Sequence, residues 1–326
     1  MNRRQSLAVI AALAGAWAAP CAFAQGYPSK PIRLISPYGP GGGNDTIARL
    51  LATGLGKTLK QTVIVENKPG ANTIIGNQFV ATSPPDGYTL ILNGNGFATN
   101  PSFYAKMPYD TVKDFAPIAF VAFTELVLVA NPSVQAKNVS ELVALAKSKD
   151  GLKFGNTGQG GPEHLASVMF GQMAGAEVTA IPYKGAAPAI TDLIGGQIQV
   201  MITARAAVQP YIRSGKLKLI AIANNARSSQ YPDVPTIAES GMPGFDTSLW
   251  YGMMAPAGTP QSIVLQLNQA INKVLREKQV LDTFASRGLF LGDEAKVGTP
   301  ELFGAFIKSE IANTARIARE AGIEPA

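Results

Sequence analysis

Cysteine and histidine are almost absent from this chain, which has one of each, Cys21 and His164. Cys21 lies in the N-terminal leader described below, so the mature chain is expected to have no disulfide and no thiol chemistry. One histidine without an H-E-x-x-H or C-x-x-C motif argues against a transition-metal site. The common serine-hydrolase and penicillin-binding motifs, G-x-S-x-G and S-x-x-K, are also missing. We therefore expect neither an enzyme nor a bound cofactor or metal.

Long apolar runs are missing as well, since no stretch beyond the leader reaches the roughly 18 consecutive apolar residues of a transmembrane helix. The leader itself has Arg3-Arg4, an apolar stretch from Leu7 to Ala19, and Ala22-Phe23-Ala24 before Gln25. This pattern is typical of a secretory signal peptide, here residues 1–24. The sequence predicts a soluble, exported protein that starts near Gln25. The general and the twin-arginine export routes both stay open.

Charge is low and evenly spread, with 15% charged residues in 326. Without the two leader arginines the chain has 26 basic and 22 acidic residues, a net charge of +4. Because the basic residues are scattered, nucleic-acid binding is not expected, whereas a modest attraction for small anions is. The length suits two domains.

A glycine-rich loop near the N-terminus is the first candidate site. A short apolar strand at 32–35 is followed by Pro37, Gly39, Pro40 and Gly41 to Gly43, which break regular structure. An amphipathic helix follows, with Asn44 or Asp45 as its N-cap. Glycines at a helix N-terminus let backbone N–H groups and the helix dipole approach an anion. The alternative is a loop that only turns the chain.

The same plan recurs in the middle of the chain. A strand at 152–154 leads into Gly155-Asn156-Thr157-Gly158-Gln159-Gly160-Gly161, and Pro162 opens a helix. Two segments with one strand–glycine–helix plan predict an anion site shared between two domains. His164, in the first turn, is interpreted as a polar residue lining that cleft, because no nucleophile motif or acidic partner accompanies it.

Strands alternate with helices along the chain, which predicts an α/β fold with parallel sheets and ligands beyond the carboxyl ends of the strands. The apolar run from Pro117 to Ala130, interrupted at Thr124-Glu125, reads as two strands joined end to end between domains. The run 249–255 reads as the return crossing. We expect one domain from residues 25–124 and 247–326, and the other from 125–246.

Several motifs in sequence order carry a family resemblance. They are Tyr27-Pro28-x-Lys30-Pro31-Ile32-Arg33, Pro40-Gly41-Gly42-x-x-Asp45-x-x-Ala48-Arg49, Glu66-Asn67-Lys68-Pro69-Gly70, Pro85-Asp86-Gly87-Tyr88-Thr89-Leu90, Pro182-Tyr183-Lys184-Gly185, Gly195-Gly196-Gln197, Pro232-Asp233-Val234-Pro235-Thr236 and Trp250-Tyr251-Gly252-x-x-Ala255-Pro256-Ala257-Gly258-Thr259-Pro260. Together they resemble the Bug-type, TctC-like solute receptors of tripartite tricarboxylate transporters, over nearly the whole mature chain.

This resemblance implies a type II periplasmic binding protein, with two α/β domains joined by two crossing strands and a ligand cleft between them. It implies a monomer that holds a small organic carboxylate between the first loops of both domains and delivers it to the membrane permease subunits. The alternative is an exported carboxylate sensor that signals to a membrane sensor protein. The ligand-binding residues expected from the loops and the resemblance are Tyr38, Gly41, Gly42, Gly43, Asn44, Asp45, Asn95, Phe97, Asn156, Thr157, Gly158, Gly160, Gly161, His164, Tyr183, Lys184, Thr203, Arg205 and Trp250.

The distal end of the site departs from the family pattern. Relatives tend to carry Asp-Asn-Leu-Pro-Ser where this chain has Thr203-Ala204-Arg205-Ala206-Ala207, and Phe97 stands where a small residue or His is usual. Loss of the acid at 203 disfavours an amino-acid ligand. Arg205 offers a fork for a second carboxylate and Phe97 an aromatic wall, which favours a terephthalate-like aromatic dicarboxylate. An aliphatic di- or tricarboxylate is the alternative, with Phe97 packed inside its domain and Arg205 facing solvent.

Overall fold

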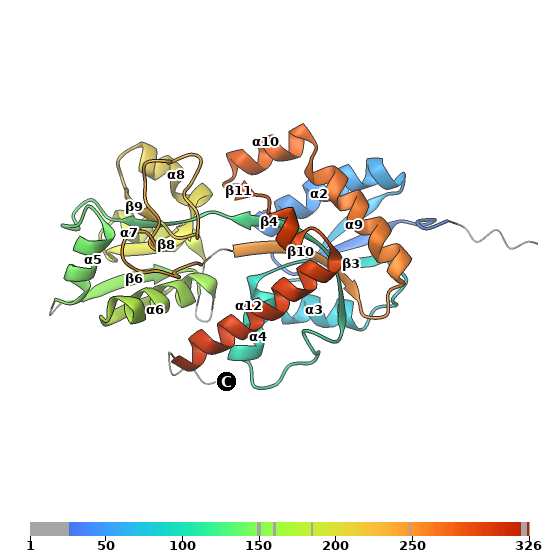
Figure 1. Cartoon of the computed structure of the whole chain (residues 1–326), viewed down its shortest axis with the longest axis horizontal. Coiled ribbons are helices and arrows are strands. Elements are labelled where there is room, and N and C mark those ends of the chain that lie inside the picture. Colours follow the sequence, from blue (N-terminus) through green and yellow to red (C-terminus); the bar gives the residue numbers. More distant parts are fainter. Residues whose placement is uncertain are drawn as a thin grey trace, which may run out of the picture.

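The computed structural model describes residues 26–148, 151–158, 161–183, 185–247, 249–320 and 325. The predicted leader and its cleavage site lie outside these residues. Two mixed sheets, each covered by helices on both faces, form two α/β domains that lie end to end (Figure 1). The predicted fold class is therefore confirmed. Within the described residues, no helix is long and apolar enough to cross a membrane.

The first sheet has the strand order β11-β4-β10-β3-β1-β2. Its strands are β1 (Ile32–Ser36), β2 (Val63–Asn67), β3 (Thr89–Gly94), β4 (Phe115–Thr124), β10 (Leu249–Pro256) and β11 (Leu289–Phe290). β1 pairs in parallel with β2 and β3, and β10 is antiparallel to β3 and β4. The parallel strands therefore end at one edge, where their loops face the second domain.

Two helical layers bury the first sheet. One face is covered by α2 (Gly43–Leu59), α9 (Gln261–Leu275) and α10 (Lys278–Ser286), and the other by α3 (Ile74–Ala81), α4 (Asn95–Phe103), α11 (Glu294–Val297) and α12 (Pro300–Glu320). The predicted apolar stripe of α2 is buried at Ile47, Leu51 and Leu55. α12 runs from the first domain toward the second (Figure 1), and its Ile317 joins the core of the second domain.

The second sheet has the order β7-β6-β8-β5-β9. Its strands are β5 (Leu126–Ala130), β6 (Leu152–Asn156), β7 (Val178–Pro182), β8 (Val200–Ala204) and β9 (Lys218–Ile222). The helices α5 (Val139–Ala146) and α6 (Pro162–Ala174) cover one face, and α7 (Ala186–Ile194) and α8 (Arg205–Arg213) cover the other. β6 is parallel to β7 and β8, so its glycine loop also leaves from the carboxyl end of the strand.

The apolar run at 117–130 forms two strands, as predicted, because β4 ends at Thr124 and β5 begins at Leu126 in the other sheet. The side chain of Asn224 holds this junction by accepting a bond from the Leu126 N–H at 2.7 Å and donating to the Thr124 carbonyl at 3.3 Å. The return strand β10 pairs Leu249 with Thr124, so both connections between the domains meet at one place. The exact domain boundaries at 124/125 and 246/247 stay a prediction.

Two glycines of α2 provide a matched test of how that helix packs. A Cβ on Gly54 would lie 2.4 Å from Cγ1 of Val274 on α9, whereas a Cβ on Gly56 would meet nothing closer than the Gln61 carbonyl at 3.5 Å. Gly54→Ala should lower the unfolding free energy by about 1–3 kcal/mol, because the stiff valine cannot move aside. Gly56→Ala should raise it by up to about 1 kcal/mol.

Urea unfolding of both variants measures these changes, and Val274→Ala should restore part of the loss in Gly54→Ala. Equal effects at both positions would show that α2 and α9 are not in tight contact at Gly54.

Candidate functional site

A cavity of about 560 Å³ lies between the two domains, at the ends of β1, β3 and β6. This volume falls in the range of small-molecule sites. The first domain contributes the loops that precede α2 and α4 and the start of β10, and the second domain contributes the loop that precedes α6. The lining residues are Tyr38, Gly39, Gly42, Gly43, Asn44, Asn72, Gly94, Asn95, Gly96, Thr157, Gly158, Gly161, Pro162, Glu163, Leu249, Trp250 and Tyr251.

The two glycine loops lead into their helices with nearly the same backbone conformation at the N-cap. Gly42 caps α2 with φ −74° and ψ 175°, and Gly161 caps α6 with φ −73° and ψ 166°. Neither N-cap residue has a side chain that could bond the first N–H groups, although in α6 Pro162 has no N–H and the Glu163 carboxyl accepts a bond from its own N–H. Two helix N-termini thus open on one cavity from opposite domains. This arrangement favours an anion that bridges them.

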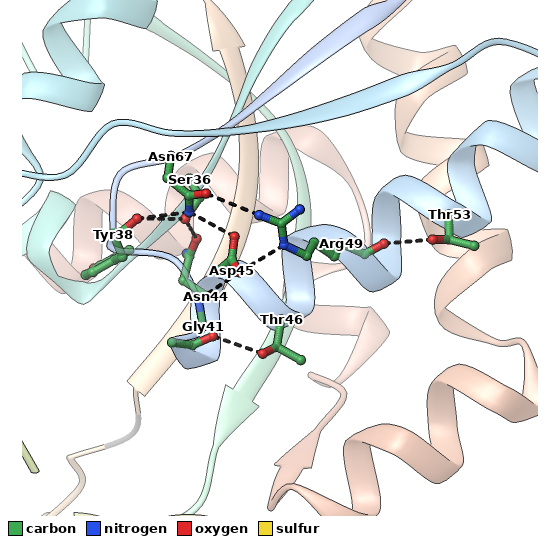
Figure 2. A network of polar contacts seen from close by, with 10 residues as sticks. Ser36, Tyr38, Gly41, Asn44, Asp45, Thr46, Arg49, Thr53 and Asn67 are labelled. Carbon is green, nitrogen blue, oxygen red and sulfur yellow. Dashed lines mark hydrogen bonds and ion pairs between the residues drawn. The ribbon is translucent and has the colours of Figure 1, made fainter. Parts of the chain in front are cut away.

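Asp45 holds the first loop in shape (Figure 2). Its carboxylate accepts bonds from the Gly41 N–H at 2.9 Å, Arg49 Nε at 3.0 Å and Asn67 Nδ2 at 2.8 Å. The bond from Arg49, with the others, lowers the pKa of Asp45 to about 2, so the anchor stays ionised at neutral pH. Asp45 is buried and does not line the cavity, which makes it a positioning residue.

Asn44 lies at the cavity wall but its amide is already engaged. It accepts from Ser36 Oγ at 2.7 Å (Figure 2) and donates to the Leu92 carbonyl at 2.9 Å, which ties α2 to β1 and β3. The residue that the sequence suggested as an N-cap therefore cross-links three elements below the loop. What the first loop presents to a ligand is mainly backbone.

The second loop is held by Asn156 and Glu163. Asn156 is fully buried, and its Oδ1 accepts from the Gly158 N–H at 3.1 Å. Its Nδ2 has no partner among the described residues. Thr157 Oγ1 lies 2.8 Å from Glu163 Oε2, which closes the loop onto the first turn of α6.

The electrostatics of the cavity are unusual for an anion site. Among the described lining residues there is no lysine or arginine, and Glu163 is the one with an ionisable carboxyl. Burial raises the pKa of Glu163, and the hydroxyl of Thr157 only partly opposes that shift. Burial also raises the pKa values of Tyr38 and Tyr251, to which the charge of Glu163 adds. Within the described part of the chain, no cluster of side chains could hold a metal ion.

Comparison with known proteins assigns this chain to a receptor family. The profile of the family described as "Tripartite tricarboxylate transporter family receptor" matches residues 47–323. The chain belongs to this receptor family. The chain is 39% identical to protein BugT of Bordetella pertussis over 99% of both chains. The resemblance seen in the sequence motifs is thus confirmed.

Solved structures of similar proteins agree in fold. The R. palustris protein Rpa4515, solved with adipate, is 31% identical with a TM-score of 0.80, covering 92% of this chain and 100% of that one. MatC of Rhodopseudomonas palustris, solved with malate, is 29% identical with a TM-score of 0.77, covering 89% and 99%. Members of this family are periplasmic solute receptors, so the chain is a receptor and not an enzyme.

The structure brings many of the predicted site residues of the receptor together. Those that line the cavity are Tyr38, Gly42, Gly43, Asn44, Asn95, Thr157, Gly158, Gly161 and Trp250. Trp250 itself is fully buried, with its ring 5.9 Å from Phe303 and 5.7 Å from Phe306. It therefore supports the wall from behind. Gly160 and Lys184 lie outside the described residues.

Arg205 is not in the cleft, which corrects the prediction of a second carboxylate site there. It is 1% exposed and begins α8 at the domain junction. Its Nε bonds Glu125 Oε2 at 3.0 Å and its Nη2 bonds the Ala285 carbonyl at 3.2 Å. The guanidinium thus pairs with the acid at the chain crossing, a partner 80 residues away in sequence that no local pattern indicates.

Phe97 also has a different place from the predicted aromatic wall. It is fully buried inside the first domain, stacked with Tyr109 at 6.5 Å and edge-on to Phe115 at 4.9 Å. This is the alternative that the sequence left open. Because α4 begins at Asn95, the third residue of the helix turns inward to the core.

Other predicted residues are not among those that line the cavity. Thr203 is buried on β8, and Tyr183 donates its hydroxyl to Asp192 Oδ2 at 2.8 Å. His164 is half-buried on α6, where burial lowers the pKa of its imidazole. Gly41, Asp45 and Asn156 shape the loops. None of these six residues lines the cavity, so their direct contact with a ligand stays a prediction.

Sequence reasoning missed several lining residues, notably Glu163 and Tyr251. An acid in the first turn of a helix is common for dipole reasons, so Glu163 carried no functional signal. Tyr251 lies next to the predicted Trp250 in the same motif. Because neighbouring side chains on a strand point to opposite faces, the alternation pattern could have indicated that Tyr251 and Trp250 face different sides. The motif therefore predicted the right segment and the wrong side chain.

The Glu125–Arg205 pair generates a prediction about stability. Arg205→Ala should lower the unfolding free energy by about 3–5 kcal/mol, because it leaves the Glu125 carboxylate buried without its partner. Arg227→Ala, which removes an ion pair to Glu239 whose side chains are both 47% exposed, should cost less than about 1 kcal/mol. Denaturant unfolding measures both. A stable Arg205→Ala variant that loses dicarboxylates selectively would return Arg205 to the binding site.

Proposed function

We propose that this receptor captures a small dicarboxylate in the cavity between its domains and passes it to the membrane subunits of a tripartite tricarboxylate transporter. It acts in the periplasm as a monomer, after removal of residues 1–24. The observation that carries the proposal is the convergence of two uncapped helix N-termini, one from each domain, on one cavity. A carboxylate there receives backbone N–H groups from both sides, and so favours the closed arrangement.

The class of ligand is narrowed by the relatives and by the wall residues. Two family structures hold the aliphatic dicarboxylates adipate and malate. The case for an aromatic diacid rested on Phe97 and Arg205, and both are buried away from the cavity. We therefore favour an aliphatic dicarboxylate over a terephthalate-like acid.

Ligand titration of the mature protein tests this assignment. Adipate or malate at 100-fold above its Kd should stabilise the folded state by about 2.7 kcal/mol and raise the melting temperature by several degrees. Hexanoate, which lacks the second carboxylate of adipate, is the matched control and should bind more weakly. Terephthalate and benzoate form the aromatic pair. A response to terephthalate alone would reverse the aliphatic choice, and a response to none of these acids would refute the dicarboxylate assignment.

The backbone contact of the first loop has its own test at Gly43. Proline is tolerated at the first position of a helix, and Gly42 already has the extended conformation that a following proline requires. Gly43→Pro removes one N–H from the cavity and should weaken dicarboxylate binding by about ten- to a hundredfold, since a hydrogen bond to a charged group contributes about 1.5–3 kcal/mol.

Gly43→Ala is the control, because it adds a Cβ at 3.1 Å from the Tyr251 hydroxyl but keeps the N–H. Calorimetric titration of both variants separates the lost donor from the added bulk. Equal affinities in the two variants would show that this N–H does not hold the ligand.

A further inference from the structure

Glu163 is the one residue with a carboxyl side chain among the described residues that line the cavity. It is the second residue of α6 and is 8% exposed. It thus stands beside the helix N-terminus where the proposed function places a ligand carboxylate. Two carboxylates in so small a space would repel each other, unless one of them carries a proton.

The partners of Glu163 do not compensate a buried charge. Its carboxyl accepts hydrogen bonds from Thr157 Oγ1 at 2.8 Å and from its own backbone N–H, and no lysine or arginine among the described residues forms an ion pair with it. An ionised carboxylate that is buried without a cation is costly, because it loses its hydration and gains little in exchange. The first turn of α6 and the Thr157 hydroxyl favour the charged form, but burial outweighs them.

The other ionisable groups around Glu163 come from three elements. Tyr38 precedes α2 and Tyr251 lies on β10, and both line the same cavity. Their hydroxyl pKa values are raised, so both are neutral over the physiological range. His164 is the next residue of α6, and its pKa is lowered by burial. None of these groups supplies a stable positive charge to Glu163.

We propose that Glu163 determines specificity as a protonated acid, donating a hydrogen bond from its carboxyl group to a carboxylate oxygen of the ligand. This inference rests on the proposed function and adds a side-chain donor to the backbone N–H groups. A proton shared between acid and carboxylate gives a short, charge-assisted bond. Ionised Glu163 would instead favour a ligand with an ammonium group at this end and would repel a carboxylate.

The consequence is a receptor whose affinity for dicarboxylates depends on pH. Above about pH 6 the carboxyls of a simple diacid are already ionised, so the ligand no longer titrates. Binding should therefore weaken as pH rises through the pKa of Glu163, with a slope that approaches about tenfold per pH unit once the acid is ionised. Release of the bound dicarboxylate would be favoured at higher pH.

The experiment is calorimetric titration of adipate and malate from about pH 6 to about pH 9. Glu163→Gln keeps the size and, through its amide, an N–H donor at every pH. We expect its affinity to stay nearly constant over this range, and to exceed that of the natural protein at the alkaline end. His164→Asn is the matched control on the same helix, and it should keep the pH slope of the natural protein.

Three outcomes in the natural protein and Glu163→Gln would overturn the inference. They are affinity that is independent of pH in the natural protein, affinity that increases with pH, and equal pH slopes in the natural protein and Glu163→Gln. If His164→Asn loses the pH dependence of dicarboxylate affinity, that dependence comes from the histidine, and the role of Glu163 is likewise refuted. If no dicarboxylate binds at any pH, the proposed function fails as well, whereas binding without a pH slope refutes this inference alone.

Discussion

The chain passes from the first sheet to the second through one buried residue, Glu125, which is bonded to both domains. Its N–H donates to the Gly288 carbonyl at 2.8 Å, and its carbonyl accepts from the Arg205 N–H at 2.9 Å. Its side chain pairs with the same arginine at 3.0 Å. The free energy needed to remove both charges of a buried ion pair from water offsets much of their electrostatic attraction. The main contribution of this pair is therefore to fix the geometry of the junction. It holds the two domains so that their glycine loops face each other.

Two carboxyl groups in the first turns of α2 and α6 are in opposite environments. Asp45, in the first turn of α2, receives a cation and two N–H donors, which lower its pKa. Glu163, in the first turn of α6, accepts from a hydroxyl and has no cation partner among the described residues, and burial raises its pKa. Environment alone separates the two acids. One is an ionised anchor that shapes a loop of backbone donors, and the other is available to act as a donor itself.

The family assignment fits a site made largely of backbone. On the proposed function, the N–H groups of the loops would bind the carboxylate that ligands such as adipate and malate share, and the remaining wall would decide which ligand fits. Within one receptor family, the wall can therefore change while the glycine loops keep their plan. This explains why the loops were recognisable from sequence and the ligand was not.

Sequence by itself determined the local structure of this protein. Strand–glycine–helix order, the apolar stripe of α2 and the interruption at Thr124-Glu125 depend on residues close in the chain, and all three appear in the structure as expected. Only the tertiary structure decided where Arg205, Phe97 and Glu163 act. Arg205 pairs with Glu125, 80 residues away, and Phe97 packs on Tyr109 and Phe115. Glu163 lines a cavity that residues of both domains form, and contacts between distant segments leave no periodic signal in the sequence.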